Sequence, residues 1–415
     1  MSTKSAKRRF SLAILALCLC VSVAPYVNVA AQQSAYFPPK GEWAKKSPAS
    51  LGLDPAKLQE AIDYAKSHET QREMDFSDQE KTFGTLLGSV PNIRAHTNGV
   101  IIYKGYVVGE WGDNTWADPT YSVAKSMLST VAGVAVRDGV IKNLDEPVSA
   151  IVKDGGYDLP GNSVITWRNH LNQESEWEGT MFTKPDTFIG HEAFGDGEMK
   201  PRERRKPGTY YEYNDVRINR FSLSLLRAFN KSVPDVFREQ VMDPIGASNT
   251  WRWIPYHNSW VEQNGHRLLS VSGGTRWGGG VWINAMDMAR FGYLWLRGGK
   301  WGDKQIVPAA YVKAALTPSK VANSPDYGFL WWLNTRQDNS KCPNGPTRGA
   351  NGQQSREGCS NYPGMPSNAF GANGAGSNTI LISPDQDLVV VWRWHAGNIA
   401  EVGKRVVAAM KSGTM

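Results

Sequence analysis

A serine and a lysine three residues apart stand at the head of an apolar run, in DPTYSVAKSMLSTVAGVAV (118–136). If a helix begins near Tyr121, the amide hydrogens of its first turn point outward at the positive end of the helix dipole. Ser122 would then lie where an oxyanion is stabilised. Lys125 follows on the same face, one turn further on. Among apolar side chains its amine would lose charge more readily, and a neutral amine can take a hydroxyl proton. The pair predicts a nucleophile and its base.

The pair is a weak signal by itself, because about one or two chance matches to so short a pattern are expected in a chain of this length. The alternative is a lysine charge on a solvated helix surface. Two further stretches of the sequence support the prediction of a nucleophile and its base. In RRKPGTYYEYNDVRIN (204–219) a Pro-Gly-Thr turn precedes Tyr213, Asn214 and Asp215 and a helix opens. In AFGANGAGSNTILISPDQDLVVVW (369–392) a glycine-rich stretch enters a strand, a turn and a second strand.

This order of motifs resembles the serine beta-lactamase and DD-peptidase superfamily. It is most similar to the class C branch, with the family VIII carboxylesterases and the 6-aminohexanoate-dimer hydrolases. The resemblance covers nearly the whole chain after its first residues, including GLDPAKL and INAMDMARFG. It implies an α+β fold of the beta-lactamase/transpeptidase-like type, in which an antiparallel sheet is flanked by helices and carries an inserted, mainly helical region.

The resemblance also implies roles for particular residues. Ser122 would be the acylated nucleophile, Lys125 its base, and Tyr213 a second general base that protonates the leaving group. The backbone N–H groups of Ser122 and Ala375 would form the oxyanion hole. The alternative for Tyr213 is a core tyrosine whose hydroxyl is hydrogen-bonded.

The chain departs from the family pattern at two points. Where the lactamases carry Lys-Thr-Gly, it has Ala372, Asn373 and Gly374, so the cation and hydroxyl that hold a substrate carboxylate are missing. Asp215 stands at the third position of Tyr-x-Asn, where it keeps an acceptor but loses the amide donor. It could instead pair with Lys125. Asp215, Asn373 and Gly374 are therefore predicted substrate-binding residues on a site that disfavours beta-lactams.

An arginine reaching the site, such as Arg276 or Arg393, is the alternative source of the missing cation. NHLNQESEWEG (169–179) resembles the loop that borders the family's cleft, so Trp177 either lines the site and binds substrate or fills the core. His170 and His395 also fall near the site, although a surface or core place is favoured for His395. No Gly-x-Ser-x-Gly elbow and no His-Glu-x-x-His metal motif occurs, and no cofactor or metal is expected.

Residues 1–31 run from a basic cluster into an apolar stretch that ends in small residues, which is typical of a secretory signal. The alternative is a membrane anchor, which needs about 20 unbroken apolar residues. Cleavage near Ala31 would remove four basic residues and lower the formal net charge from +7 to +3. The mature protein is predicted to be periplasmic or secreted, without a stable membrane span. A nucleic-acid partner has little support, because no basic run is longer than RERRK (202–206).

Cys342 and Cys359 remain after signal removal, in a polar insert rich in glycine and proline. In an oxidising compartment they are predicted to form a disulfide. Two unpaired thiols are the alternative. A metal site is disfavoured because the insert contains no histidine.

The periodicity of the sequence indicates a sheet built from both ends of the chain around an inserted helical region. The hydrolase domain is predicted over 32–415, with the sheet region at about 32–150 and 281–415 and the helical region at about 151–280. Predicted elements are helices over 53–68, 121–138, 214–232, 284–299 and from about 399, a hairpin over 99–111, and strands over 327–334, 377–383 and 387–394. Asp54 and Asn284 are the expected helix caps.

Together these features predict an exported serine hydrolase that forms an acyl-enzyme on Ser122 and acts on small esters. Hydrolysis of small amides, such as aminohexanoate oligomers or D-amino acid peptides, or of beta-lactams is the enzymatic alternative. A non-catalytic binding or scaffold protein of the same fold is the alternative from another class. The sequence does not predict the acyl group, the leaving group or the oligomeric state.

Overall fold

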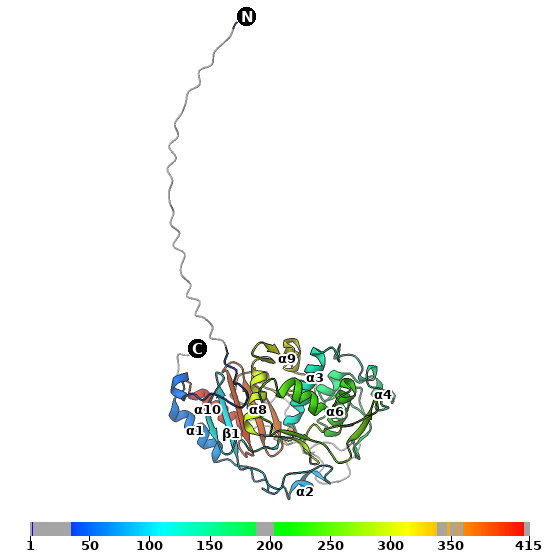
Figure 1. Ribbon diagram of the computed structural model, residues 1–415, viewed down its shortest axis with the longest axis horizontal. Helices are drawn as coiled ribbons and strands as arrows, with labels where there is room; N and C mark the ends of the chain where they lie inside the picture. The colour runs from blue at the N-terminus through cyan, green and yellow to red at the C-terminus, as the bar shows by residue number, and fades with distance from the viewer. Residues whose placement is uncertain are drawn as a thin grey trace. The chain divides into compact units, whose positions relative to one another are not determined.

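The computed structural model describes residue 2 and residues 35–187, 203–337, 347–348, 354–355 and 360–410. The chain divides into two compact units, Met1–Ala35 and Tyr36–Met415, and the second is the subject here (Figure 1). Apart from residue 2, the predicted signal peptide over 1–31 lies outside the described residues, as do Cys342 and Cys359.

A six-stranded antiparallel sheet contains strands from both ends of the second unit, in the order β12-β15-β16-β17-β1-β2. The strands are β1 (Asn98–Tyr103), β2 (Tyr106–Trp111), β12 (Trp332–Leu333), β15 (Phe370–Gly374), β16 (Asn378–Ser383) and β17 (Leu388–Arg393). β1 pairs with β17 in the register Val100↔Val391. The N-terminal hairpin therefore joins the C-terminal strands, which confirms the predicted sheet.

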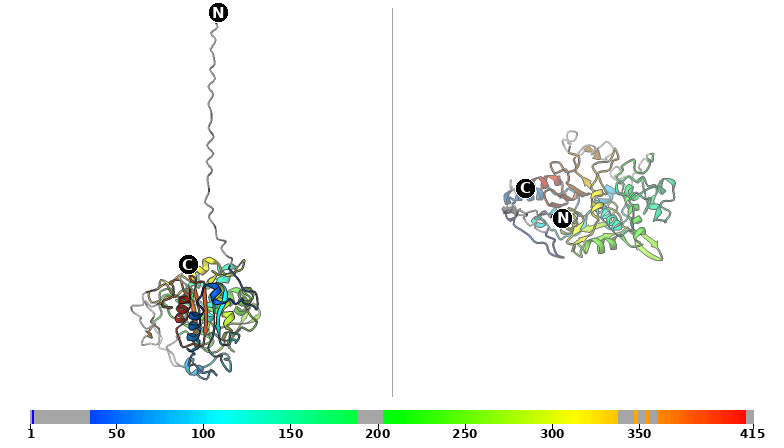
Figure 2. Two further views of the ribbon diagram at one scale, coloured as in Figure 1. Left: turned by 90° about the vertical axis from the view of Figure 1, so that its left-hand side faces the viewer. Right: turned by 90° about the horizontal axis from the view of Figure 1, so that it is seen from above.

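Both faces of the sheet are buried, so its central strands are almost continuously apolar. Val100 and Ile102 of β1 belong to one core cluster, whereas Ile101 and Tyr103 belong to another. Helices α1 (Pro55–Lys66) and α10 (Ile399–Ala408) pack together against one face (Figure 2), and α8 (Ala285–Leu296) covers the other. Alternate side chains of β1 therefore point into two separate cores, one on each face of the sheet.

Helix α3 (Val123–Arg137) is buried among other helices beside the sheet. All of its residues from Val123 to Ala135 are buried. It packs against α6 (Asp215–Phe229), against α9 (Ala309–Ala315) and against the edge region of the sheet at β15. A short sheet in the order β3-β9-β6 lies just before α3, and the Thr120 amide donates to the Val281 carbonyl. The start of α3 is therefore fixed from several sides.

Short elements complete the described part of the chain. The helical ones are η1 (Pro48–Leu51), α2 (Gln79–Phe83), η2 (Val148–Ala150), α4 (Pro160–Ser163), α5 (Trp167–Leu171), α7 (Val233–Phe237) and η3 (Arg238–Met242). The strands are β3 (Asp118–Pro119), β4 (Thr180–Met181), β5 (Lys184–Pro185), β6 (Arg252–Ile254), β7 (Trp260–Gln263), β8 (His266–Leu269), β9 (Gly280–Ile283), β10 (Lys300–Trp301), β11 (Lys304–Gln305), β13 (Thr347–Arg348) and β14 (Gln354–Ser355). The region over 151–280 thus contains both helices and strands.

Most predicted elements are confirmed to within a few residues, and the expected caps are present. Asp54 Oδ1 accepts from two amides at the start of α1, and the Asn284 side chain caps α8. The strand predicted over 327–334 is reduced to β12, because Leu330 has a left-handed backbone with φ 60° and its amide donates to Leu171. Within the described ranges, no helix combines the length and apolar character that a membrane crossing requires.

Candidate active site

A sharp turn before α3 presents the hydroxyl of Ser122. Ser122 directly precedes the helix, with φ −72° and ψ −4°, and is half-buried. Tyr121 has a left-handed backbone, φ 51°, which a bulky residue adopts only where its surroundings hold it. Its ring packs edge-on against Trp394, and its hydroxyl donates to Gln79 Oε1 at 2.7 Å. These contacts hold Ser122 at the positive end of α3.

Lys125 lies between Ser122 and Asp215. Its Nζ is 2.9 Å from Ser122 Oγ and 2.5 Å from Asp215 Oδ1, and it donates to the Gly273 carbonyl at 3.3 Å. Only 1% of the side chain is exposed, so it is not a solvated surface lysine. The predicted burial of Lys125 is confirmed, and of the two roles considered for Asp215 the pairing with Lys125 is present. The lysine points toward the start of α6, where Asp215 supplies a negative charge.

The second oxygen of Asp215 faces a guanidinium. Asp215 Oδ2 is 3.8 Å from Arg276 Nη1, and 6% of the Arg276 side chain is exposed. Burial lowers the pKa of Arg276, while Asp215 and Tyr256 act in the opposite direction. The main chain is fixed by Gln79, whose Nε2 donates to the carbonyls of Thr275 and Arg276 at 2.9 Å. One carboxylate therefore stands between the Lys125 amine and the Arg276 guanidinium.

Aromatic stacking places Tyr213 beside the same lysine. The Tyr213 ring centroid is 4.8 Å from Lys125 Nζ, and the ring stacks on Trp332 with 6.0 Å between centroids. Tyr327 meets the other ring of this pair edge-on, 4.9 Å from Trp332, and burial raises the pKa of its hydroxyl. Tyr213 itself is half-buried. Trp332 therefore connects two tyrosines at the site.

Two glycines allow main-chain segments to approach the serine. A Cβ on Gly274 would stand 3.8 Å from Ser122 Oγ. A Cβ on Gly374 would stand 3.1 Å from the Ser122 nitrogen and 2.1 Å from the Thr120 carbonyl oxygen, which leaves no space for a side chain. Ala375 follows directly, in the turn between β15 and β16. The end of β15 thus adjoins the Ser122 amide.

The residues that replace the family's Lys-Thr carry no charge. Ala372 is buried on β15, and Asn373 is half-buried with its Oδ1 at 3.5 Å from the Tyr362 hydroxyl. Arg393 does not supply a cation here, because its fully buried guanidinium donates to the carbonyls of Asp118 and Pro119 at 3.0 Å. Of the two arginines considered from the sequence, Arg276 is the one beside Asp215.

Three other predicted neighbours of the site are core residues. Trp177 is 3% exposed, and its Nε1 donates to the Gly156 carbonyl at 2.7 Å, so the core alternative describes this ring. His170 Nε2 lies 2.8 Å from the Tyr157 hydroxyl. Burial lowers the pKa of His170 and of His395 to about 3, so both imidazoles are neutral at neutral pH.

Sequence reasoning did not assign Gly274, Gln79 or Trp332 to the site. Gly274 stands in the glycine-dense stretch SGGTRWGGG (272–280), which was an available signal for close main-chain approach. Gln79 and Trp332 had no local signal, because their partners are distant in the sequence. In the ranges that the structure describes, no group of three or more His, Cys, Asp or Glu side chains could hold a metal ion.

Comparison with known protein families identifies the class of protein. The model of the beta-lactamase family matches residues 96–398, a span that contains Ser122, Lys125, Tyr213 and Gly374. The chain therefore belongs to the beta-lactamase family, and it is a serine hydrolase. This match confirms the resemblance drawn from the three motifs and the predicted fold class.

Solved structures share the fold at low sequence identity. A protein from Bacteroides dorei DSM 17855 assigned as a beta-lactamase aligns with a TM-score of 0.54 and 14% identity over 86% of this chain and 99% of that one. A protein from Bacillus anthracis assigned as a 6-aminohexanoate-dimer hydrolase gives 0.50 and 15%, over 90% and 88%. The octameric penicillin-binding protein homologue from Pyrococcus abyssi gives 0.52 and 14%, over 86% and 77%. A search of curated proteins found no match.

Proposed function

We propose that the protein is an exported serine hydrolase that forms an acyl-enzyme on Ser122 and acts on small esters. The observation that carries the proposal is the hydrogen bond of 2.9 Å between Ser122 Oγ and Lys125 Nζ at the start of a buried helix. Such contact between a nucleophile and a base is the geometric signature of covalent catalysis. Export rests on the sequence pattern over 1–31.

In the acylation step Ser122 Oγ attacks the ester carbonyl carbon while its proton passes to a base. Lys125 in its neutral form is within reach, and Tyr213 beside it is the second base. The amides of Ser122 and Ala375 stabilise the oxyanion. The carbon–oxygen bond to the alcohol then breaks, and the alcohol leaves with a proton from Tyr213, which the proton taken from Ser122 by Lys125 replaces. Water attacks the acyl-enzyme in the reverse sense and releases the acid.

A preference for neutral esters follows from the charges around the serine. β15 offers Ala372 and Asn373 in place of a cation and a hydroxyl, so a substrate carboxylate gains no partner there. Asp215 faces Lys125 and Arg276, and an ionised carboxylate cannot donate to a substrate amide carbonyl. An ester needs only the oxyanion contacts, which strengthen toward the transition state.

The proposal is tested with a fluorophosphonate probe and a panel of p-nitrophenyl esters, D-aminoacyl anilides and aminohexanoate oligomers. The wild-type protein should take up one label and hydrolyse the esters fastest. Ser122→Ala should abolish labelling, and Lys125→Ala should lower turnover by about 10²-fold or more, measured on the folded fraction because the variant also loses a buried ion pair. Lys142→Ala, at an exposed position, is the matched control. Labelling of Ser122→Ala at the wild-type level would refute the nucleophile.

A further inference from the structure

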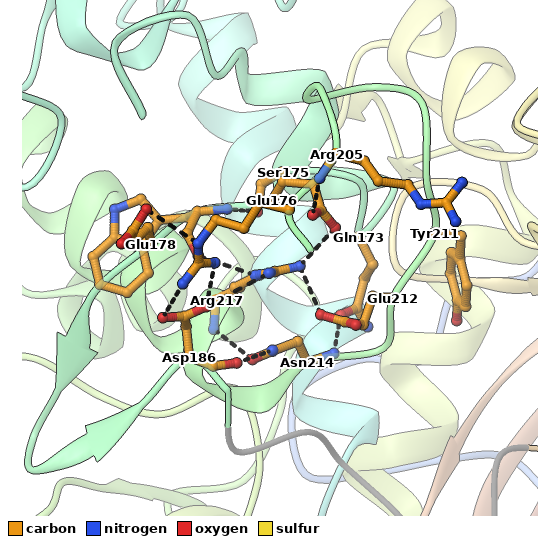
Figure 3. Close-up of polar contacts among 12 residues, drawn as sticks. Gln173, Ser175, Glu176, Glu178, Asp186, Arg205, Tyr211, Glu212, Asn214 and Arg217 are labelled. Carbon is orange, nitrogen blue, oxygen red and sulfur yellow. Dashed lines mark hydrogen bonds and ion pairs between the residues drawn. The ribbon is translucent and has the colours of Figure 1, made fainter. Parts of the chain in front are cut away.

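A buried arginine on α6 is surrounded by three carboxylates beside the candidate active site. Arg217 Nη1 lies 2.8 Å from Glu212 Oε2 and 3.2 Å from Glu176 Oε1, and Nη2 lies 3.6 Å from Asp186 Oδ2. The side chains of these four residues are at most 6% exposed. Figure 3 shows the guanidinium at the centre of this group. Buried charges of this kind are costly unless they are paired, so each depends on the others.

The carboxylates come from two separate segments. Glu176 and Asp186 belong to the loop from Gln173 to Asp186, which includes the two-residue strands β4 and β5, while Glu212 immediately precedes Tyr213. Arg217 therefore joins that loop to the segment from Glu212 to Asp215. Its Nε also donates to the Trp177 carbonyl at 3.1 Å, so the guanidinium contacts main chain as well as carboxylates.

Main-chain contacts on both sides of Tyr213 join the same two segments. The Glu212 amide donates to the Gln173 carbonyl at 3.0 Å, and the Asn214 amide donates to Gln173 Oε1 at 2.9 Å. Asn214 Nδ2 donates to the Asp186 carbonyl at 2.6 Å, and Asn214 Oδ1 accepts from the Arg217 amide at 3.1 Å. The neighbours of Tyr213 are thus fixed to the loop that Arg217 holds.

We propose that Arg217 is a positioning residue for the reaction, and the inference rests on the proposed function. By holding the segment from Glu212 to Asp215 against the loop from Gln173 to Asp186, it sets where the Tyr213 phenol and the Asp215 carboxylate stand relative to Ser122. Arg217 does not contact the reacting atoms. Its effect on turnover comes from the geometry of the two residues that flank Asn214.

The same helix provides a matched control. Arg220 is one turn further along α6 and 3% exposed, and its guanidinium pairs with Asp154 at 2.6 Å and 3.0 Å. It is as buried as Arg217 and forms a comparable ion pair. Its carboxylate partner lies outside both the segment from Glu212 to Asp215 and the loop from Gln173 to Asp186, and its guanidinium faces that loop at the Trp177 ring, 6.0 Å from the centroid. Replacing either arginine by lysine keeps the charge and removes the planar fork of donors.

The experiment compares wild type, Arg217→Lys and Arg220→Lys by kcat and KM for p-nitrophenyl butyrate, the pH profile of kcat/KM, the rate of fluorophosphonate labelling and Tm. Arg217→Lys should lower kcat by about tenfold to 10²-fold with KM within about twofold, because small displacements of catalytic groups have effects of this size. Its pH profile should also shift. Arg220→Lys should lower Tm by a similar amount while kcat stays within about twofold and the pH profile is unchanged.

Equal loss of kcat in both variants, or an unchanged kcat and pH profile in Arg217→Lys, would overturn the inference. If Arg217→Lys does not fold, the isosteric Glu212→Gln replaces it and should lower kcat with the same profile shift, whereas wild-type kinetics in Glu212→Gln would overturn the inference. A wild-type protein that is neither labelled nor active would refute the proposed function, and with it any reaction for Arg217 to serve.

Discussion

The Asp215 carboxylate accepts a hydrogen bond from Lys125 at 2.5 Å, across the interface between α6 and α3. The other oxygen of the same carboxylate faces Arg276 at 3.8 Å. The family pattern places a neutral amide at this position, so the negative charge is a feature of this chain. It fixes the lysine beside Ser122.

Asp215→Ala should lower kcat/KM for p-nitrophenyl butyrate by about tenfold or more. The Asp215 carboxylate accepts a hydrogen bond from the Lys125 amine at 2.5 Å, and the displacement of a catalytic group has effects of this size. The measurement is kcat/KM for the purified variants at one pH. Asp243→Ala, which removes an exposed carboxylate, should leave kcat/KM unaltered. Wild-type kcat/KM in Asp215→Ala would mean that this carboxylate does not position Lys125.

Gly374→Ala should reduce turnover by roughly tenfold or more, because the added Cβ would meet the Thr120 carbonyl at 2.1 Å and push β15 away from the Ser122 amide. The same variant should have a lower Tm. Gly161→Ala serves as the control, since a Cβ there has no heavy atom within 4 Å. Full activity in Gly374→Ala would exclude this strand end from the oxyanion hole.

Ester hydrolysis should exceed nitrocefin hydrolysis by orders of magnitude in kcat/KM. A beta-lactam carboxylate that is desolvated without a partner costs several kcal/mol, and about 1.4 kcal/mol is a factor of ten in rate. The comparison uses p-nitrophenyl butyrate and nitrocefin in one preparation. Comparable values would indicate that a cation such as Arg276 holds the lactam carboxylate, and the ester preference would then be wrong.

The contribution of Glu174 to stability should decrease as the pH rises through the window between about 4.5 and 6, because burial raises its pKa from 4.5 to about 6 despite its hydrogen bond with Ser319. In that window the unfolded chain has released this proton and the native state retains it, so this group lowers the free energy of unfolding by at most about 2 kcal/mol. His170 and His395 act in the opposite direction below about pH 6.5, because their lowered pKa keeps them neutral in the native state, and the effect of Glu174 is therefore measured as a difference between variants.

Glu174→Gln removes this dependence, so urea denaturation should show that the variant gains stability relative to wild type between pH 4.5 and pH 7. Glu146→Gln, at an exposed position, should follow the wild-type pH dependence. Parallel curves for wild type and Glu174→Gln would contradict a proton held in the native state.

Local signals predicted much of the fold. Asp54 followed by proline predicts the start of α1, and Asn284 predicts the start of α8, because a cap is formed by residues within one turn. Ser122 and Lys125 were recognised in the same way, since three residues on a helix bring two side chains together. The order of motifs along the chain added Tyr213 and Gly374.

Most individual side-chain contacts between distant segments were beyond the reach of such patterns, although the pairing of the N-terminal hairpin with the C-terminal strands was predicted. The stack of Tyr213 on Trp332 and the ion pair of Arg276 with Asp215 depend on tertiary packing that no local periodicity encodes. At Leu330 a local pattern predicted too much. The apolar run around it is typical of a strand, but Leu330 has a left-handed backbone and is buried in a turn. Burial of Lys125 was predicted, and its pairing with Asp215 was named as the alternative to a substrate-binding role for that carboxylate.

The pairing of β1 with β17 also sets an order of events for a chain synthesised from its N-terminus. β1 has six buried residues, and one of its two edges stays open until β17 at the far end of the sequence has been made. An open apolar edge is a template for wrong pairing, and long-range pairing of this kind is slow. β15, which completes the surroundings of Ser122, belongs to the same late segment. Premature termination before β17 therefore yields an inert, aggregation-prone fragment rather than a weakened enzyme.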